Sequence, residues 1–150
     1  PLAQGWAVAM PSYDLCPQAT IPEIGDQIAS AVDAIAHRVP GPIRLTGHSA
    51  GGQLVARIGA IGPNVAWQSR LSGIVPISPV ADLTPLRRTS MNADFKLDAA
   101  QAKTQSPVNM PAPDCLVEIW VGADERPVFI EQSHQHSHLC AVGRENHGNH

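Results

Sequence analysis

Residues 43–54, Ile-Arg-Leu-Thr-Gly-His-Ser-Ala-Gly-Gly-Gln-Leu, constrain the fold of this chain more than any other stretch. A short apolar run enters a Gly-x-Ser-x-Gly pentad, and a segment with apolar residues at helical spacing leaves it. Gly47 and Gly51 lie two residues on either side of Ser49 and have no β-carbon, so a neighbouring segment can pass close to a sharply turned backbone. The pattern predicts a strand, a tight turn at Ser49 and a helix.

The turn predicted at Ser49 matters because a serine hydroxyl is a poor nucleophile in water. An enzyme activates it by lifting it clear of the chain and placing a base beside it. A strand-turn-helix around Gly-x-Ser-x-Gly, the nucleophile elbow, presents the hydroxyl in this way. A bare pentad occurs by chance in about one chain of this length in twenty. The flanking patterns favour the catalytic interpretation over a glycine-rich turn whose serine has no chemical role.

Apolar periodicity and turn residues predict the other elements. Thr20 and Glu23 have capping-box spacing, and apolar residues then recur at steps of three or four, which predicts a helix that ends near Arg38. The apolar run Trp6–Met10 suits a strand buried on both faces. We expect strands at 6–10, 43–46, 71–78 and 115–122, a short candidate strand at 140–142, helices at 20–38, 50–60 and 131–139, and a helical insert within 79–110.

This order of elements indicates the α/β class. Strands that alternate with helices form a mostly parallel sheet flanked by helices on both faces, with right-handed crossovers. The sequence has no internal repeat, linker or low-complexity tract. We therefore expect one domain over residues 1–150.

Composition excludes several classes of function. The 150 residues include 10 basic and 13 acidic side chains, a net charge of −3, and no basic block that would bind nucleic acid. No apolar run approaches the roughly 20 residues that span a bilayer, and no secretory signal opens the chain. Cys16, Cys115 and Cys140 are odd in number and far apart, which favours reduced thiols in a cytoplasmic protein. We expect no nucleic-acid partner and no membrane association.

A nucleophile at Ser49 requires an acid later in the chain, because elbow enzymes follow the order Ser, Asp or Glu, His. Asp124 is the best placed acid, since it follows the predicted strand 115–122, and sites in open α/β sheets gather at the carboxyl ends of strands. Glu125 is the second choice. Asp82 also follows a strand, but its Asp-Leu-Thr-Pro context suits a structural turn.

The base is expected in a loop after the last strand. Residues 145–148, Glu-Asn-His-Gly, read as such a loop, which favours His147 as the base and leaves His150 as the second choice. His48 is expected to support the turn. His134, His136 and His138 are expected on a solvated helix; although His134 and His138 would share one face, no third ligand has metal-binding spacing, so we expect no metal site.

An acyl-transfer site also needs donors for the oxyanion. The backbone N–H of Ala50, which directly follows the predicted nucleophile, is the first. The second is expected from a loop after an earlier strand, with a sequence similar to His-Gly-Gly. No such motif precedes Trp6.

Several stretches that together span nearly the whole chain resemble one family, the α/β-hydrolase esterases related to kynurenine formamidase (arylformamidase). This resemblance implies an α/β-hydrolase fold. It also implies that the family's first strands and its His-Gly-Gly loop, which would precede residue 1, are absent from this sequence. It implies hydrolysis of an aryl formamide or a small carboxylic ester by a serine hydrolase without a cofactor. The matching triad positions are Ser49, Asp124 and His147. The similar stretches are 4–8, 13–17, 47–52 (Gly-His-Ser-Ala-Gly-Gly), 77–86, 91–92 and 121–129 (Val-Gly-Ala-Asp-Glu-Arg-Pro-Val-Phe).

Two other functions remain open on the sequence. The chain could be a hydrolase-like scaffold or interaction module that has lost catalysis, which predicts a formed elbow with no base near Ser49. It could also be a histidine-rich metal-binding protein. Missing leading strands would leave an open sheet edge, through which two copies could pair as a homo-oligomer.

Overall fold

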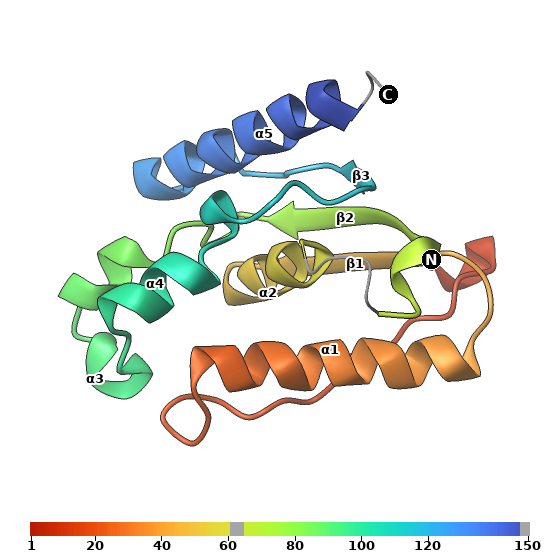
Figure 1. Ribbon diagram of the computed structural model, residues 1–150, viewed down its shortest axis with the longest axis horizontal. Helices are drawn as coiled ribbons and strands as arrows, with labels where there is room; N and C mark the ends of the chain where they lie inside the picture. The colour runs from red at the N-terminus through yellow and green to blue at the C-terminus, as the bar shows by residue number, and fades with distance from the viewer. Residues whose placement is uncertain (61–64, 148–150) are drawn as a thin grey trace.

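A computed structural model of the chain describes residues 1–60 and 65–147, and the side chains as far as Ala141. Figure 1 shows a small sheet with helices packed around it. The strands are β1 (Ile43–His48), β2 (Leu71–Ile77) and β3 (Leu116–Val117). The α-helices are α1 (Ile21–Arg38), α2 (Ala50–Gly59), α3 (Asn92–Phe95), α4 (Ala99–Gln105) and α5 (Pro127–His147), and the short 3-10 helices are η1 (Leu2–Gln4), η2 (Gln68–Arg70), η3 (Thr84–Arg88) and η4 (Pro107–Asn109).

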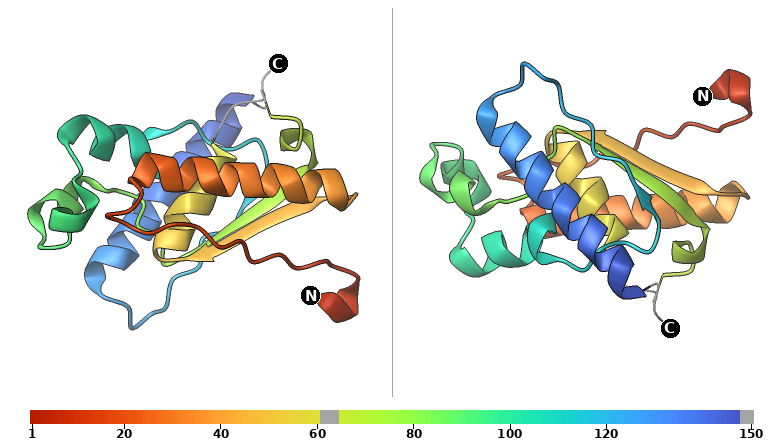
Figure 2. Two further views of the ribbon diagram at one scale, coloured as in Figure 1. Left: turned by 90° about the horizontal axis from the view of Figure 1, so that it is seen from below. Right: turned by 90° about the horizontal axis from the view of Figure 1, so that it is seen from above.

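The sheet is parallel in the order β1-β2-β3, which confirms the predicted α/β class. From Arg44 and Gly73 onward, β1 and β2 run in continuous register to the pair His48 and Ile77. Helices α1 and α2 lie on one face of the sheet (Figure 2). On β1, half-buried residues alternate with exposed ones, and the exposed set is Arg44, Thr46 and His48.

Helix α1 begins at the predicted capping box. The Thr20 hydroxyl accepts a hydrogen bond from the Glu23 N–H, and the Glu23 carboxylate accepts one from the Thr20 N–H at 2.7 Å. The backbone hydrogen bond from Thr20 is the largest cause that lowers the pKa of Glu23. Of the predicted apolar stripe, Ile24, Ile28 and Val32 are buried. Local capping and the apolar stripe therefore agree, and the predicted helix is confirmed.

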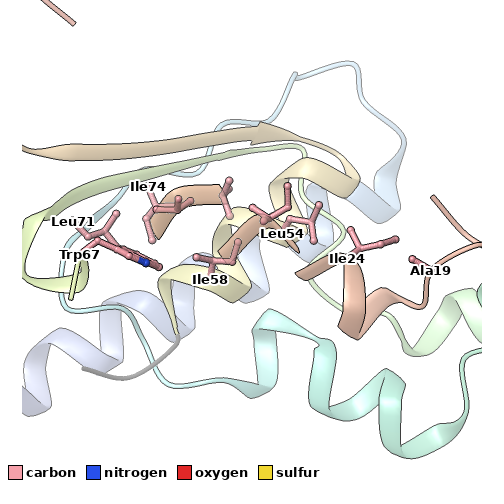
Figure 3. Close-up of a cluster of buried hydrophobic side chains, with 10 residues drawn as sticks. Ala19, Ile24, Leu54, Ile58, Trp67, Leu71 and Ile74 are labelled. Carbon is pink, nitrogen blue, oxygen red and sulfur yellow. The ribbon is translucent and has the colours of Figure 1, made fainter. Parts of the chain in front are cut away.

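The main core lies between these helices and the sheet. Ile58 of α2 and Ile74 of β2 are 0 % and 1 % exposed, and Trp67 lies beside them at 1 %. The cluster is shown in Figure 3 and includes Ala19, Ile24, Leu54, Ile58, Trp67, Leu71 and Ile74. Leu54, Val55 and Ile58 are all buried, so the apolar side of α2 faces this core.

The predicted strand at Trp6–Met10 is wrong. The segment has no strand partner among the described residues, and Val8 and Met10 are 57 % and 91 % exposed. The run is apolar enough for a buried strand, but a strand exists only where a neighbour completes its hydrogen-bond ladder. Its contact with the sheet is a cation–π contact, with the Arg44 guanidinium 5.2 Å from the centre of the Trp6 ring.

The last third of the chain differs from expectation in two further ways. The predicted strand 115–122 is reduced to β3 and one isolated bridge from Trp120 to Ile77, although its backbone follows β2 as far as Trp120. The predicted strand at 140–142 and the predicted loop at 145–148 are wrong as far as His147, because these residues extend α5. Periodicity failed here because polar residues take the buried positions of α5.

Helix α5 buries a mostly polar face. Its buried residues are Gln132, Ser133, His136 and Cys140, whereas His134 and His138 are exposed. The prediction that all three histidines are solvated is therefore wrong for His136. Burial lowers the pKa of the His136 imidazole to about 4, from an ordinary value of 6.5. The imidazole of His136 is thus neutral in the folded protein at pH 7.

We predict that His136 makes the protein sensitive to acid. Between pH 6.5 and pH 4 the unfolded chain binds a proton at this ring and the folded chain does not, so the free energy of unfolding falls as pH falls, by about 3 kcal/mol in all. Chemical denaturation at pH 7, 5.5 and 4.5 measures the change. His136→Gln should flatten the pH dependence, whereas His138→Gln, at an exposed site, should leave it unchanged. A wild-type slope in His136→Gln would contradict the assignment.

The carboxyl end of α1 is closed by a side chain from a distant part of the chain. The Arg70 guanidinium donates to the carbonyl oxygens of Ala36 at 2.6 Å and Gly41 at 2.8 Å, and to that of Val39. The last carbonyls of a helix have no intrahelical donor and form the negative end of the helix dipole. One cation therefore ties α1 to the start of β2.

We predict that Arg70→Met lowers the free energy of unfolding by about 1–3 kcal/mol, because carbonyls that now accept from a cation lose their donor. Arg88→Met is the matched control, since Arg88 is exposed and should change stability by less than about 0.5 kcal/mol. Urea denaturation measures both variants. Equal stability of the two would show that Arg70 has no special role.

Candidate active site

Ser49 occupies the sharp turn between β1 and α2. Its backbone has φ 55° and ψ −112°, which is an unfavourable conformation for a residue with a β-carbon. Such a conformation costs on the order of 1–3 kcal/mol and persists only where its surroundings hold it. The predicted strand-turn-helix is therefore confirmed, and Ser49 has the strained geometry of a nucleophile elbow.

Close backbone contact confirms the steric role predicted for Gly47 but not the one predicted for Gly51. A β-carbon on Gly47 would overlap the carbonyl group of Gly51. One on Gly52 would lie 3.0 Å from the Pro79 Cα, so the start of α2 and the segment after β2 would have to move slightly apart. One on Gly51 meets nothing within 4 Å, so the steric role predicted for Gly51 belongs to Gly52.

The turn is held by the last residue of β2 and by the segment that follows it. The Ser49 N–H donates to the Ile77 carbonyl at 2.9 Å, and the Ser49 carbonyl accepts from the N–H of Val80 at 3.3 Å and of Gln53 at 3.1 Å. Ala50 is the first residue of α2, so its N–H has no acceptor within the helix. The predicted oxyanion donor therefore lies at the positive end of the α2 dipole.

Asp124 lies in the loop between the β3 segment and α5. It is exposed and forms no hydrogen bond or ion pair within the described residues. Its neighbour Glu125 is half-buried and accepts a hydrogen bond from the Ser78 hydroxyl at 2.7 Å. Ser49 follows β1 and Asp124 follows the β3 segment, so both lie at the carboxyl edge of the parallel sheet, with β2 between these two strands. Strands β1 and β3 are two strand spacings, or about 10 Å, apart.

Asp82 has the structural role predicted for it. Its carboxylate accepts a hydrogen bond from the Thr84 N–H at 2.8 Å, which closes a local turn before η3. Its own N–H donates to the side chain of Gln132 on α5. Asp82 thus joins the insert to α5.

Within residues 1–60 and 65–141, whose side chains are described, the structure does not bring a histidine to Ser49. Helix α5 starts beside the strand carboxyl ends and runs back to the other side of the molecule (Figure 1). At 1.5 Å per residue, the backbone of His147 lies about 30 Å along this helix from its start near Asp124. The side chain of His147, and all of His150, lie outside the described residues. No described histidine hydrogen-bonds the Ser49 hydroxyl.

The other histidines have no arrangement for a metal ion. The His48 imidazole is exposed and forms no hydrogen bond with the described part of the chain, so the support predicted for the turn is not seen. Within the same residues, no group of three or more His, Cys, Asp or Glu side chains could hold a metal. None of the described helices has the length and apolar character needed to cross a membrane.

Ser78 is the feature of this site that sequence reasoning missed. It directly follows β2, is 2 % exposed and has φ 42°. A signal was present in the sequence, because Ser78 ends the third predicted strand as Ser49 follows the second and Asp124 the fourth. Polar residues after parallel strands meet at one edge of the sheet.

Comparison with solved structures supports this description. A "putative thioesterase" from Silicibacter sp. TM1040 matches with a TM-score of 0.87 and 51 % identity, over 92 % of this chain and 53 % of that protein. Prolyl oligopeptidase B from Galerina marginata matches at TM-score 0.60 and 19 % identity, over 80 % of this chain and 19 % of that one. Esterase B from Lactobacillus rhamnosis matches at TM-score 0.57 and 15 % identity, over 93 % of this chain and 67 % of that one.

The last two likenesses show the fold alone. This chain spans about half the length of the Silicibacter protein. The model of the alpha/beta hydrolase fold matches residues 3–128, which include the Ser49 turn, the Ser78 strand end and the loop with Asp124. With the parallel sheet and the strained serine turn, this match shows that the chain belongs to the alpha/beta-hydrolase family.

Proposed function

We propose that this chain forms the nucleophile-bearing part of a serine hydrolase that acts on small carboxylic esters, with Ser49 as its nucleophile. The observation that supports this most is the strained Ser49 backbone between β1 and α2. Strain of this kind is retained where function needs it. The Silicibacter protein, by its name a thioesterase, fits the same class of reaction.

In the proposed reaction the Ser49 hydroxyl oxygen attacks the carbonyl carbon of the substrate. A base takes the hydroxyl proton and returns it to the leaving group as the carbon–heteroatom bond breaks. The Ala50 N–H donates to the oxyanion of the tetrahedral intermediate. Water then attacks the acyl-enzyme, the base takes its proton, and the acid is released with the Ser49 hydroxyl restored. No cofactor takes part in these steps.

We assign Asp124 as the acid that orients the base. Its carboxylate is exposed at the edge where Ser49 lies, and no described residue competes for it. The roughly 10 Å between the outer strands leaves room for an imidazole between hydroxyl and carboxylate. His147 remains the proposed base, with His150 second. With α5 formed over its full length the backbone of His147 is distant, so this role requires the end of the helix to take another path.

The substrate within this class is part of the proposal. Resemblance to the arylformamidase-related esterases favours aryl formamides and small esters, whereas the name of the Silicibacter protein favours thioesters. All three place a carbonyl carbon before a leaving group that takes one proton. We propose a small-molecule substrate and a cytoplasmic location, the latter on the three cysteines of the sequence.

We predict that a fluorophosphonate probe labels Ser49 and that Ser49→Ala abolishes the label, as measured by intact-mass and peptide mass spectrometry. Asp124→Asn should slow labelling by about 10³–10⁴-fold, because the base then loses its orienting carboxylate. Ser72→Ala is the control, since Ser72 is an exposed serine at the opposite end of β2, and it should label as the wild type does. Wild-type protein that stays unlabelled at neutral pH would overturn the proposal.

The same samples separate the candidate substrates. We predict turnover of 4-nitrophenyl acetate, an acetyl thioester or formanilide by the wild type and none by Ser49→Ala. The ranking of kcat/KM among the three assigns the substrate class. His147→Ala and His150→Ala then identify the base, since only the variant that lacks it should lose labelling. If both variants are labelled as the wild type is, neither histidine is the base.

A second candidate function is a hydrolase-like scaffold without catalysis. The observation that favours it is the formed elbow with no described histidine at the Ser49 hydroxyl, which is what this alternative predicted. It leads to the opposite result in the labelling experiment: a folded protein that the probe does not modify. A cooperative unfolding transition in the same sample shows that the protein is folded.

A further inference from the structure

Ser78 combines burial, backbone strain and two hydrogen bonds to one loop. It is 2 % exposed and has φ 42°, which a residue with a β-carbon seldom adopts. Its N–H donates to the Trp120 carbonyl at 2.7 Å, and its hydroxyl donates to the Glu125 carboxylate at 2.7 Å. The two bonds hold the two ends of residues 120–125, the loop that contains Asp124.

The residues beside Ser78 hold the other half of the site. Ile77 accepts from the Ser49 N–H, and Val80 donates to the Ser49 carbonyl. Residues 77–80, the last residue of the central strand β2 and the three that follow it, therefore bond to the Ser49 turn on one side and to the Asp124 loop on the other. Figure 1 shows β2 in this central position. The position of Asp124 relative to Ser49 depends on this segment.

We propose that Ser78 and Glu125 are a positioning pair that fixes the loop of Asp124 relative to Ser49. The proposal rests on the hydrolase function proposed above. Glu125 is half-buried and bonded to Ser78, whereas Asp124 is exposed and has no described partner. The two neighbouring carboxylates thus have different roles: Glu125 anchors the loop, and Asp124 orients the base.

The strain at Ser78 supports this role. A hydroxyl–carboxylate hydrogen bond of 2.7 Å is charge-assisted, and such bonds are stronger than neutral ones. Glycine would adopt φ 42° without strain, so a residue with a β-carbon at this position costs free energy. The hydroxyl is the group that a glycine would lack. The hydrogen bond from the Ser78 hydroxyl to Glu125 therefore offsets the free-energy cost of the strained backbone.

The test compares variants that remove the bond in different ways. Ser78→Gly removes the hydroxyl and suits the backbone angle, so it should fold; Ser78→Ala removes the hydroxyl and keeps the strain. Glu125→Ala removes the acceptor, and Glu125→Gln retains an acceptor oxygen without the charge. Ser72→Ala is the control on the same strand. Hydrogen exchange of the amides of residues 120–126 and the rate of fluorophosphonate labelling are measured on each.

We predict that Ser78→Gly, Ser78→Ala and Glu125→Ala speed hydrogen exchange in residues 120–126 about tenfold or more and slow labelling about 10–100-fold. Where turnover is measured, kcat should fall with KM little changed. The double variant Ser78→Gly/Glu125→Ala should be no worse than either single variant, since both remove one interaction. Glu125→Gln should stay within about threefold of the wild type, and Ser72→Ala should match it.

Three results would overturn the pairing: unchanged exchange in residues 120–126, additive losses in the double variant, or a Glu125→Gln defect as large as that of Asp124→Asn. The last would make Glu125 itself the catalytic acid. Hydrogen exchange needs no activity, so the two proposals fail separately. Wild-type protein that is never labelled overturns the hydrolase function, while the exchange data still decide whether Ser78 and Glu125 anchor the loop.

Discussion

The parallel pairing of β1 with β2 determines where the turns of the candidate site lie. The ladder keeps one register from Arg44 and Gly73 to His48 and Ile77, so both strands end at the same edge. Each ends in a serine with positive φ, Ser49 after β1 and Ser78 after β2. Hydrogen bonds across the strand ends then hold both turns. The strained backbone conformation of Ser49 is therefore held by hydrogen bonds to the neighbouring strand end as well as by the turn itself.

How much could be predicted from the sequence depends on whether the signal is local. The capping box at Thr20 and Glu23 and the pentad around Ser49 specify their own geometry within a few residues, and both predictions are confirmed. Trp6–Met10 failed because a strand needs a partner, and sequence spacing cannot report whether one lies beside it. The structural turn at Asp82 was predictable from its local residues, whereas the Ser78 contact with Glu125, 47 residues apart, was not.

Helix α5 shows the same limit at larger scale. Three of its four buried residues up to Ala141, namely Gln132, Ser133 and His136, are polar, so no apolar stripe marks the inner face of this part of the helix. The expected loop around His147 became helix as a result. The Ser49 turn, the proposed oxyanion donor Ala50 and the Asp124 loop all lie at one edge of the sheet. The position of the proposed base His147 depends on where α5 ends.

A structure of the protein after reaction with a phosphonate ester would show whether Ser49 is the nucleophile, because the adduct copies the tetrahedral intermediate. We expect a covalent bond from the Ser49 hydroxyl oxygen to phosphorus, with a phosphoryl oxygen about 2.7–3.1 Å from the Ala50 nitrogen. The Ser49 backbone should keep its positive φ. A phosphonate attached elsewhere, or a Ser49 adduct whose phosphoryl oxygens all point away from Ala50, would contradict it.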